Sequence, residues 1–183
     1  SARRVVFGGE AAVLTVFSDI TDQVLAERIL KASEQRLASQ SNALTELTAR
    51  QADSSGSFDE RLRGILEASA RTLQVERLSL WRMDDDRQVI RCAGMHHRAS
   101  HSHESGAALR RDDAPAYFEA LECERVIAAG DAHTDPRTRD FRHAYLAPNE
   151  IGAMLDVPLR QDDRMVGVLC AEHVGSARAW TVD

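Results

Sequence analysis

The sequence is poor in cysteine and in lysine. Its three cysteines, Cys92, Cys123 and Cys170, are odd in number and widely spaced, and no C-x-x-C pair occurs. This pattern excludes a disulfide framework and a thiolate zinc site, and it indicates a reducing, cytoplasmic environment. Lys31 is the only lysine among 23 basic residues. A compositional bias toward arginine explains this preference more simply than a binding role does.

Long apolar runs and an excess of positive charge are also lacking. No segment approaches the roughly 18 consecutive apolar residues of a membrane span, and the N-terminus has no signal-peptide pattern, so we expect no membrane span in this fragment. The net charge of −6 disfavours a dedicated nucleic-acid binder. The 183 residues, of which 43% are hydrophobic, suffice for one ordinary domain and some further segments.

The first segment, residues 1–21, has the pattern of a β-hairpin. Runs rich in β-branched and apolar residues flank Gly8-Gly9, a pair that can adopt positive φ angles in a two-residue turn. Two strands cannot bury a core alone, so the hairpin is expected to be part of another domain or an addition to one.

A heptad pattern follows in residues 22–52. Leu30, Leu37 and Leu44 lie seven residues apart, and a half-polar companion stripe consists of Ala26, Ser33, Gln40 and Leu47. The pattern fits either an amphipathic helix lying on its own domain or a parallel coiled coil. We favour the coiled coil, because no nearby segment offers a covering surface. The sequence therefore predicts a homodimer with Leu30, Leu37, Leu44 and Leu47 at its interface, followed by a polar linker at 53–56.

The remaining residues, 57–183, have an α+β pattern with an antiparallel sheet and flanking helices. Ser57 and Glu60 form a capping box that begins a helix reaching about Gln74. Two hairpins are expected, at 78–94 and 153–173, with an irregular polar stretch at 95–112. The predicted elements between the hairpins are helices at 115–121 and 136–145 and a short strand at 126–128.

Several segments of this domain share the pattern of one family: the leading helix, Arg77–Met83, Gly152–Leu159 and Met165–Gly175. Because of these segments, residues 57–183 resemble a GAF domain. The resemblance implies a sheet with helices on one face and a small-molecule pocket on the other, walled here by 95–124 and 130–150. The family's last helix is expected to be missing from this chain.

The N-terminal segments have a resemblance of their own. Residues 1–21, ending in Asp19-Ile20-Thr21, resemble the last two strands of a PAS domain. Residues 22–52 then resemble the signalling helix that follows such a domain.

Aromatic residues recur at helical offsets in the two segments expected to cover the sheet. They either pack in the core or form the wall of a pocket. Asp156 interrupts an apolar strand, so it either lies at the pocket or pairs with a neighbour such as Arg82 or Arg91. The ligand-binding candidates are Trp81, Arg91, Tyr117, Phe118, Phe141, Tyr145, Asp156 and Cys170.

Two further clusters contain residue types used in metal binding or catalysis. The histidines are weak metal candidates, because none forms an i, i+4 pair on a predicted element, and a flexible loop at the pocket mouth is the alternative: His96, His97, His101 and His103. The second cluster is rich in turn-forming residues and is interpreted as structural: Asp131, His133, Asp135 and Asp140. No hydrolase or phosphate-loop motif occurs, so the fragment is predicted not to be an enzyme.

The resemblance also lets two kinds of ligand be tested. Bilin-binding relatives attach their pigment through a cysteine usually followed by histidine, but the cysteines here precede Ala93, Glu124 and Ala171. Cyclic-nucleotide-binding relatives carry an N-K…F…D-E pattern, and this domain contains no lysine. Neither cofactor has support from the sequence, and the cofactor remains unknown.

The resemblance implies a sensory and regulatory module of a bacterial signal-transduction protein. A sensor histidine kinase of a two-component system or a diguanylate cyclase is the expected parent. Two alternatives remain open: a purely structural dimerisation and relay domain without a ligand, and a metal or redox sensor built on the histidines and Cys92.

Overall fold

The computed structural model describes residues 2–7, 10–15, 24–25, 28–35, 38 and 57–180. The chain divides into two compact units, residues 1–42 and 43–183. In the first unit, β1 (Ala2–Phe7) and β2 (Glu10–Thr15) pair antiparallel with Phe7 opposite Glu10, as the hairpin pattern predicts. Residues 28–35 are helical. Leu37, Leu44, Leu47 and the 53–56 linker lie outside the described residues, so the coiled coil and the PAS origin stay predictions.

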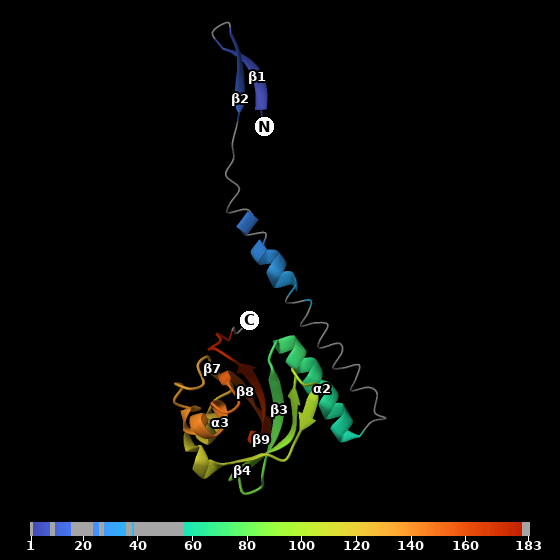
Figure 1. The fold of residues 1–183 in the computed structure, drawn as a ribbon, viewed down its shortest axis with the longest axis vertical. Helices are drawn as coiled ribbons and strands as arrows, with labels where there is room; N and C mark the ends of the chain where they lie inside the picture. The colour runs from blue at the N-terminus through green and yellow to red at the C-terminus, as the bar shows by residue number, and fades with distance from the viewer. Residues whose placement is uncertain are drawn as a thin grey trace. The chain divides into compact units, whose positions relative to one another are not determined.

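The second unit is built on an antiparallel sheet of seven strands. Its strands are β3 (Arg77–Met83), β4 (Val89–His97), β5 (Ser102–Glu104), β6 (Ala108–Arg110), β7 (Ile127–Ala129), β8 (Ile151–Gln161) and β9 (Arg164–Val174). The order across the sheet is β5-β4-β3-β9-β8-β7, and β6 also pairs with β4 (Figure 1). Both predicted hairpins are present. The β8–β9 turn has positive φ at Asp162 and Asp163, as a two-residue type I′ turn requires.

Helix α2 (Phe58–Leu73) covers one face of the sheet. The predicted capping box is present: the Ser57 hydroxyl accepts a hydrogen bond from the Glu60 amide, and the Glu60 carboxylate accepts one from the Ser57 amide. The helix ends at Gln74, which adopts a left-handed conformation. Leu62 and Leu66 on its apolar face form one core cluster with residues of the strands beneath the helix.

The second core cluster lies on the opposite face of the sheet, which is covered by α3 (Pro115–Cys123) and two irregular turns, η2 (Arg139–Phe141) and η3 (Arg142–Leu146). Figure 1 shows α2 and α3 on opposite sides of the sheet. We refer to residues 111–124 and 130–146 on this side as the cover. The sheet is therefore enclosed between α2 and the cover.

Two expectations for this unit are wrong. Residues 136–145 do not form one helix, because the buried Thr138 hydroxyl donates to the Ala132 carbonyl at 2.7 Å and fixes a turn where a first helical turn would lie. Residues 95–112 are not irregular throughout: they contain the end of β4 and the two short strands β5 and β6. These strands lie at the edge of the sheet, where polar side chains face water, so their sequence lacks apolar alternation.

Gly167 marks a close approach between β9 and β3. A Cβ atom at this position would lie 2.3 Å from the carbonyl oxygen of Trp81, so any side chain would collide with the neighbouring backbone. A glycine between two valines of a strand is typical of such a close backbone approach. It also places Trp81, one of the ligand-binding candidates, firmly in the sheet.

Within the described part of the chain, no helix is long and apolar enough to cross a membrane.

Candidate functional site

A cavity of about 460 Å³ lies between the sheet and the cover. Its sheet side includes Trp81 from β3 and Cys170 and Glu172 from β9. Three aromatic residues form much of the wall on the cover side: Tyr117, Phe141 and Tyr145. The volume lies within the range typical of small-molecule sites, and the lining is mostly apolar with a few polar groups.

The aromatic residues of the cover hold one another in place. The rings of Tyr117 and Phe141 meet edge to face with centroids 5.1 Å apart, and Phe141 meets Tyr145 in the same way at 6.2 Å. Such pairs contribute roughly 0.5–1.5 kcal/mol beyond the burial of their surface. The wall of the cavity is therefore one connected aromatic row running from α3 to η3.

Tyr117 also joins the cover to the sheet. Its hydroxyl donates a hydrogen bond to Asp156 Oδ2 at 2.8 Å and lies 3.6 Å from Cys170 Sγ. Asp156 is fully buried, and burial raises the pKa of its carboxyl group to about 7. The pairing of Asp156 with Arg82 or Arg91, considered from the sequence, is wrong; the partner is Tyr117.

A second polar link crosses the cavity at Tyr145. Its hydroxyl donates to Glu172 Oε1 at 2.7 Å and accepts from Arg77 Nη2 at 3.2 Å. Arg77 and Glu172 form a buried ion pair with Nε and Oε2 3.0 Å apart. Burial raises the pKa of Glu172 despite the guanidinium beside it. A ligand that moves Tyr145 would therefore disturb a buried charge pair of the sheet.

Five of the ligand-binding candidates lie in the cavity wall: Trp81, Tyr117, Phe141, Tyr145 and Cys170. The other three do not. Arg91 is exposed on β4, Phe118 is buried in the core with Arg111 stacked 5.0 Å from its ring centre, and Asp156 lies behind Tyr117.

Three carboxylates of the wall were not among the candidates: Asp113, Asp140 and Glu172. Asp140, interpreted from the sequence as structural, is exposed at the rim. Glu172 could have been identified from the sequence, because it is a charged residue that follows the apolar run of β9.

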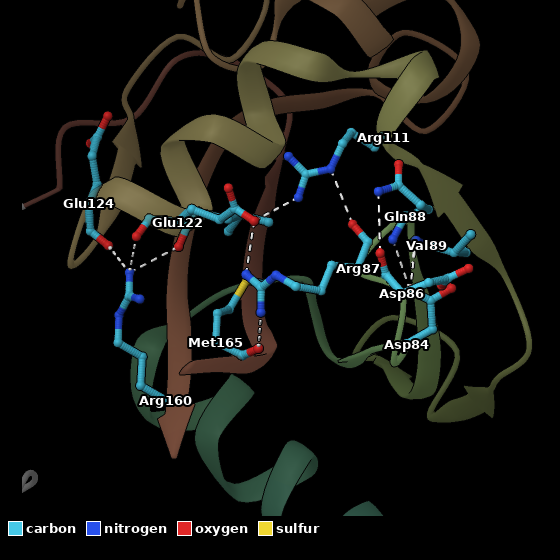
Figure 2. Close-up of polar contacts among 11 residues, drawn as sticks. Asp84, Asp86, Arg87, Gln88, Val89, Arg111, Glu122, Glu124, Arg160 and Met165 are labelled. Carbon is cyan, nitrogen blue, oxygen red and sulfur yellow. Dashed lines mark hydrogen bonds and ion pairs between the residues drawn. The ribbon is translucent and has the colours of Figure 1, made fainter. Parts of the chain in front are cut away.

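An ionic network fastens α3 beside the cavity. Glu122 Oε1 accepts hydrogen bonds from Arg87 Nη2 at 2.8 Å and from Arg111 Nη2 at 2.7 Å. Figure 2 shows Glu122 between these two guanidinium groups, with Arg160 approaching the end of the helix from β8. Arg160 Nη2 lies 2.6 Å from the Glu122 carbonyl oxygen, where a cation also complements the helix dipole. The cover is thus tied to two hairpins of the sheet.

Three of the four histidines lie on strands β4 and β5, His101 lies in the turn between these strands, and none of the four lines the cavity. His96 in β4 is buried opposite His103 in β5, and the two rings are 4.8 Å apart. Burial lowers the pKa of both. His97 Nε2 lies 2.8 Å from Glu104 Oε1, and His101 is exposed. Among residues 57–180 and the other described residues, no three His, Cys, Asp or Glu side chains are grouped to hold a metal ion.

The two buried cysteines, Cys92 and Cys170, give the redox alternative no support. Burial raises the pKa of Cys92 to about 11 and that of Cys170 well above its ordinary value. Both side chains are therefore protonated thiols at neutral pH, which is the unreactive form.

Comparison with known proteins identifies relatives of this architecture. The family model of the GAF domain matches residues 57–183. No curated protein matches the chain. A phycoerythrobilin-bound GAF domain from a cyanobacterial phytochrome is 16% identical, with a TM-score of 0.64 over 80% of this chain and 86% of the other.

Two further solved structures have the same fold. The GAF domain of a two-component sensor histidine kinase from Bacillus halodurans is 20% identical, with a TM-score of 0.52 over 69% of this chain and 82% of the other. Free methionine-R-sulfoxide reductase from Neisseria meningitidis, in complex with its substrate, is 14% identical, with a TM-score of 0.58 over 75% of this chain and 74% of the other. At these identities the likenesses carry the fold and no ligand or activity. The family model matches more than half of the chain, with the antiparallel sheet and its flanking helices, and the chain belongs to the GAF domain family.

Proposed function

We propose that this chain is a sensory and regulatory module of a cytoplasmic bacterial signalling protein, and that its GAF domain senses a small ligand in the cavity between sheet and cover. The GAF domain is a regulatory and sensory domain and not a catalytic one. A sensor histidine kinase of a two-component system is the proposed parent, with a diguanylate cyclase as the other choice. The kinase neighbour of the same fold supports this choice.

The cavity is the observation that carries the proposal. A relay domain without a ligand would be expected to fill this space with side chains, whereas about 460 Å³ remains beside an aromatic row. The polar links Tyr117–Asp156 and Tyr145–Glu172 join the cover to the sheet on two sides of this space. A ligand that binds better when one of these links is rearranged would shift the population of cover positions.

The proposed relay is a homodimer through the 22–52 helix. Leu30, in the described helical part of the first unit, is 60% exposed in the single chain. An exposed leucine on the apolar seam that the sequence predicts favours a second copy as its partner. A change in the cover would then reach a pair of domains joined by one coiled coil.

Screening for ligands by native mass spectrometry and thermal shift tests the sensing function. We expect at least one small metabolite to bind the wild type and to raise its melting temperature. Ala144→Trp, which places a large ring in the cavity wall, should abolish the shift. Ala147→Trp is the matched control, because Ala147 is exposed in the same segment and does not line the cavity. A library without a hit, or a hit that Ala144→Trp leaves unchanged, would contradict the proposal.

A further inference from the structure

The charged residues that line the cavity are all acidic. Asp113 and Asp140 are exposed at its rim, and Glu172 is buried in its wall. Of the residues that the structure describes, no arginine, lysine or histidine lines the cavity. Within the same part of the chain, neither rim carboxylate forms a hydrogen bond or an ion pair. Unpaired carboxylates at the mouth of a cleft make the potential there negative, and cations are drawn toward it.

Glu172 provides a second and independent observation. Its side chain is 2% exposed, and Oε1 accepts the hydrogen bond from Tyr145. Oε2 lies 3.0 Å from Arg77 Nε, yet neither atom has a hydrogen-bond partner of adequate geometry among the described residues. The ion pair with Arg77 therefore leaves Oε2 without a well-aligned N–H donor. An N–H group of a molecule in the cavity would supply the missing donor through a charge-assisted hydrogen bond.

The aromatic residues provide the third observation. Trp81 on the sheet side faces a cover row made of Tyr117, Phe141 and Tyr145, and all four line the cavity. Aromatic faces attract cations through the negative potential of the ring, and the attraction is stronger where water is excluded. A cavity that combines aromatic walls with carboxylates has the chemistry of a cation site.

Arg77 is the positively charged group with which an anionic ligand could pair. Its guanidinium group is already engaged: it pairs with Glu172, donates to Tyr145 and contacts Met95 Sδ at 3.1 Å. It is buried and does not line the cavity. An anionic ligand would have to pass both rim carboxylates to reach a cation that already has a counter-ion.

We propose that the cavity binds a small organic cation that carries at least one N–H donor on its charged nitrogen. The proposal rests on the ligand-sensing function proposed above and specifies the class of ligand. The charged nitrogen lies among the aromatic rings and donates to Glu172, and the apolar remainder fills the rest of the wall. Asp113 and Asp140 attract the cation to the mouth and exclude anions.

Two series of probes with a constant ring and a varying charge test this inference. The first consists of tryptamine, tryptophol and indole-3-acetate, and the second of benzylamine, benzyl alcohol and benzoate. In calorimetric titrations of the full chain at pH 7.5 and low salt, we expect the cation to bind at least tenfold more tightly than the neutral member of its series. The anion should bind most weakly. Equal binding across a series, preference for the anion, or no binding by either cation would overturn the proposal.

Variants of the carboxylates connect the preference to named side chains. Glu172→Gln keeps the shape and removes the charge, so the ratio of cation to neutral affinity should fall at least tenfold. Asp140→Asn should lower this ratio about twofold to fivefold. Asp112→Asn is the control, because Asp112 is exposed, adjacent to Asp113 and outside the cavity wall. A folded Glu172→Gln protein that retains the full preference would refute the assignment.

Failure of this inference can be told apart from failure of the sensing function. If Glu172→Gln does not fold, the double variant Asp113→Asn, Asp140→Asn takes its place, and an unchanged preference in it would overturn the role of the rim. If the metabolite screen instead yields neutral or anionic ligands that Ala144→Trp abolishes, the cation proposal fails while ligand sensing stands.

Discussion

Asp156 illustrates how a single residue sets a pH dependence for the domain. Its carboxyl group is fully buried, Oδ2 accepts from Tyr117, and Oδ1 has no partner among the described residues. Burial raises the pKa of Asp156 from its ordinary value of 3.8 to about 7. Between these two values the folded state holds a proton that the unfolded chain has released. The contribution of Asp156 to stability therefore falls as pH rises from about 4 to about 7.

Asp156→Asn should stabilise the domain at alkaline pH. The amide is neutral at every pH and its oxygen can still accept from Tyr117, so the cost of a buried charge disappears. At about 1.4 kcal/mol per pKa unit, we expect the variant to be roughly 2–4 kcal/mol more stable than the wild type at pH 8. This advantage should shrink to at most about 1 kcal/mol at pH 4.5. Urea unfolding at the two pH values measures the difference.

The control for this experiment is Asp131→Asn, which removes an exposed carboxylate that accepts from the His133 amide. It should leave the stability difference near zero at both pH values. An advantage of Asp156→Asn that is independent of pH would show that the buried carboxyl group is not the titrating group.

Residues with local signals were predictable from the sequence, and residues with distant partners were not. The capping box at Ser57 and Glu60 depends on positions three residues apart. The close approach at Gly167 follows from a glycine inside an apolar strand. Asp156 is unusual already in the sequence, but its partner Tyr117 lies 39 residues away on the cover. Only the packing of the cover on the sheet reveals this pairing.

Ionic contacts hold helix α3 in position beside the sheet. Its last turn holds Glu122, which joins Arg87 of the β3–β4 turn to Arg111 of the η1 turn (Arg111–Asp113). These hydrogen bonds lower the pKa of Glu122, so the network is intact above that pKa and is lost on acidification below it. Partly exposed pairs of this kind contribute only about 0.2–1 kcal/mol each. Their role is to fix the position of the helix that carries Tyr117.

Arg160→Ala should loosen the end of α3 without unfolding the domain. The guanidinium group lies within 2.6–3.3 Å of the carbonyl oxygens of Leu121, Glu122 and Glu124, which the helix leaves unpaired. We expect a loss of about 1 kcal/mol in the free energy of unfolding and faster amide exchange in 115–124. Hydrogen exchange followed by mass spectrometry measures this change. Arg164→Ala, an exposed arginine on the neighbouring strand, should leave the exchange unaltered.

Regular elements were easier to predict than irregular ones. The helix at 58–73 and the β8–β9 hairpin follow from hydrophobic periodicity and turn residues, and both are present. The sequence predicts one helix in place of the turns η2 and η3, because Phe141 and Tyr145 have helical spacing. The buried hydroxyl of Thr138 decides the local backbone there, and periodicity does not detect such a bond.

At the scale of the whole domain, the sequence could locate the cavity and five residues of its lining but not the carboxylates. The resemblance indicated the segments 95–124 and 130–150 as its wall, and the cover does come from them. Tyr117 and Phe118 are consecutive aromatic residues on α3; one lines the cavity, and the other is buried in the core. Periodicity cannot separate two neighbours on a helix covered from two directions. The carboxylates at the rim were missed because loop residues carry no periodic signal.

The proposed dimer is important for signalling, because ligand binding in one domain is a signal only if its effect reaches another part of the protein. Leu30 is exposed in the single chain, as are Leu25 and Ile29 nearby. Exposing a leucine forfeits roughly 1.5–3 kcal/mol relative to full burial. A short helix is also marginal in water without a packing partner. A second copy of the helix removes both penalties, and the polar companion positions Ser33 and Gln40 keep the pair weak enough to shift.

Leu37→Glu should convert the dimer into a monomer. Leu37 lies at the centre of the predicted seam between Leu30 and Leu44, so a charge there would place two carboxylates opposite each other in a parallel pair. We expect sedimentation velocity to give a dimer for the wild type and a monomer for the variant at equal concentration. Ala38→Glu adds the same charge one residue away from the seam and should leave the dimer intact. A monomeric wild type, or a Leu37→Glu protein as dimeric as the wild type, would mean that the seam does not join two chains.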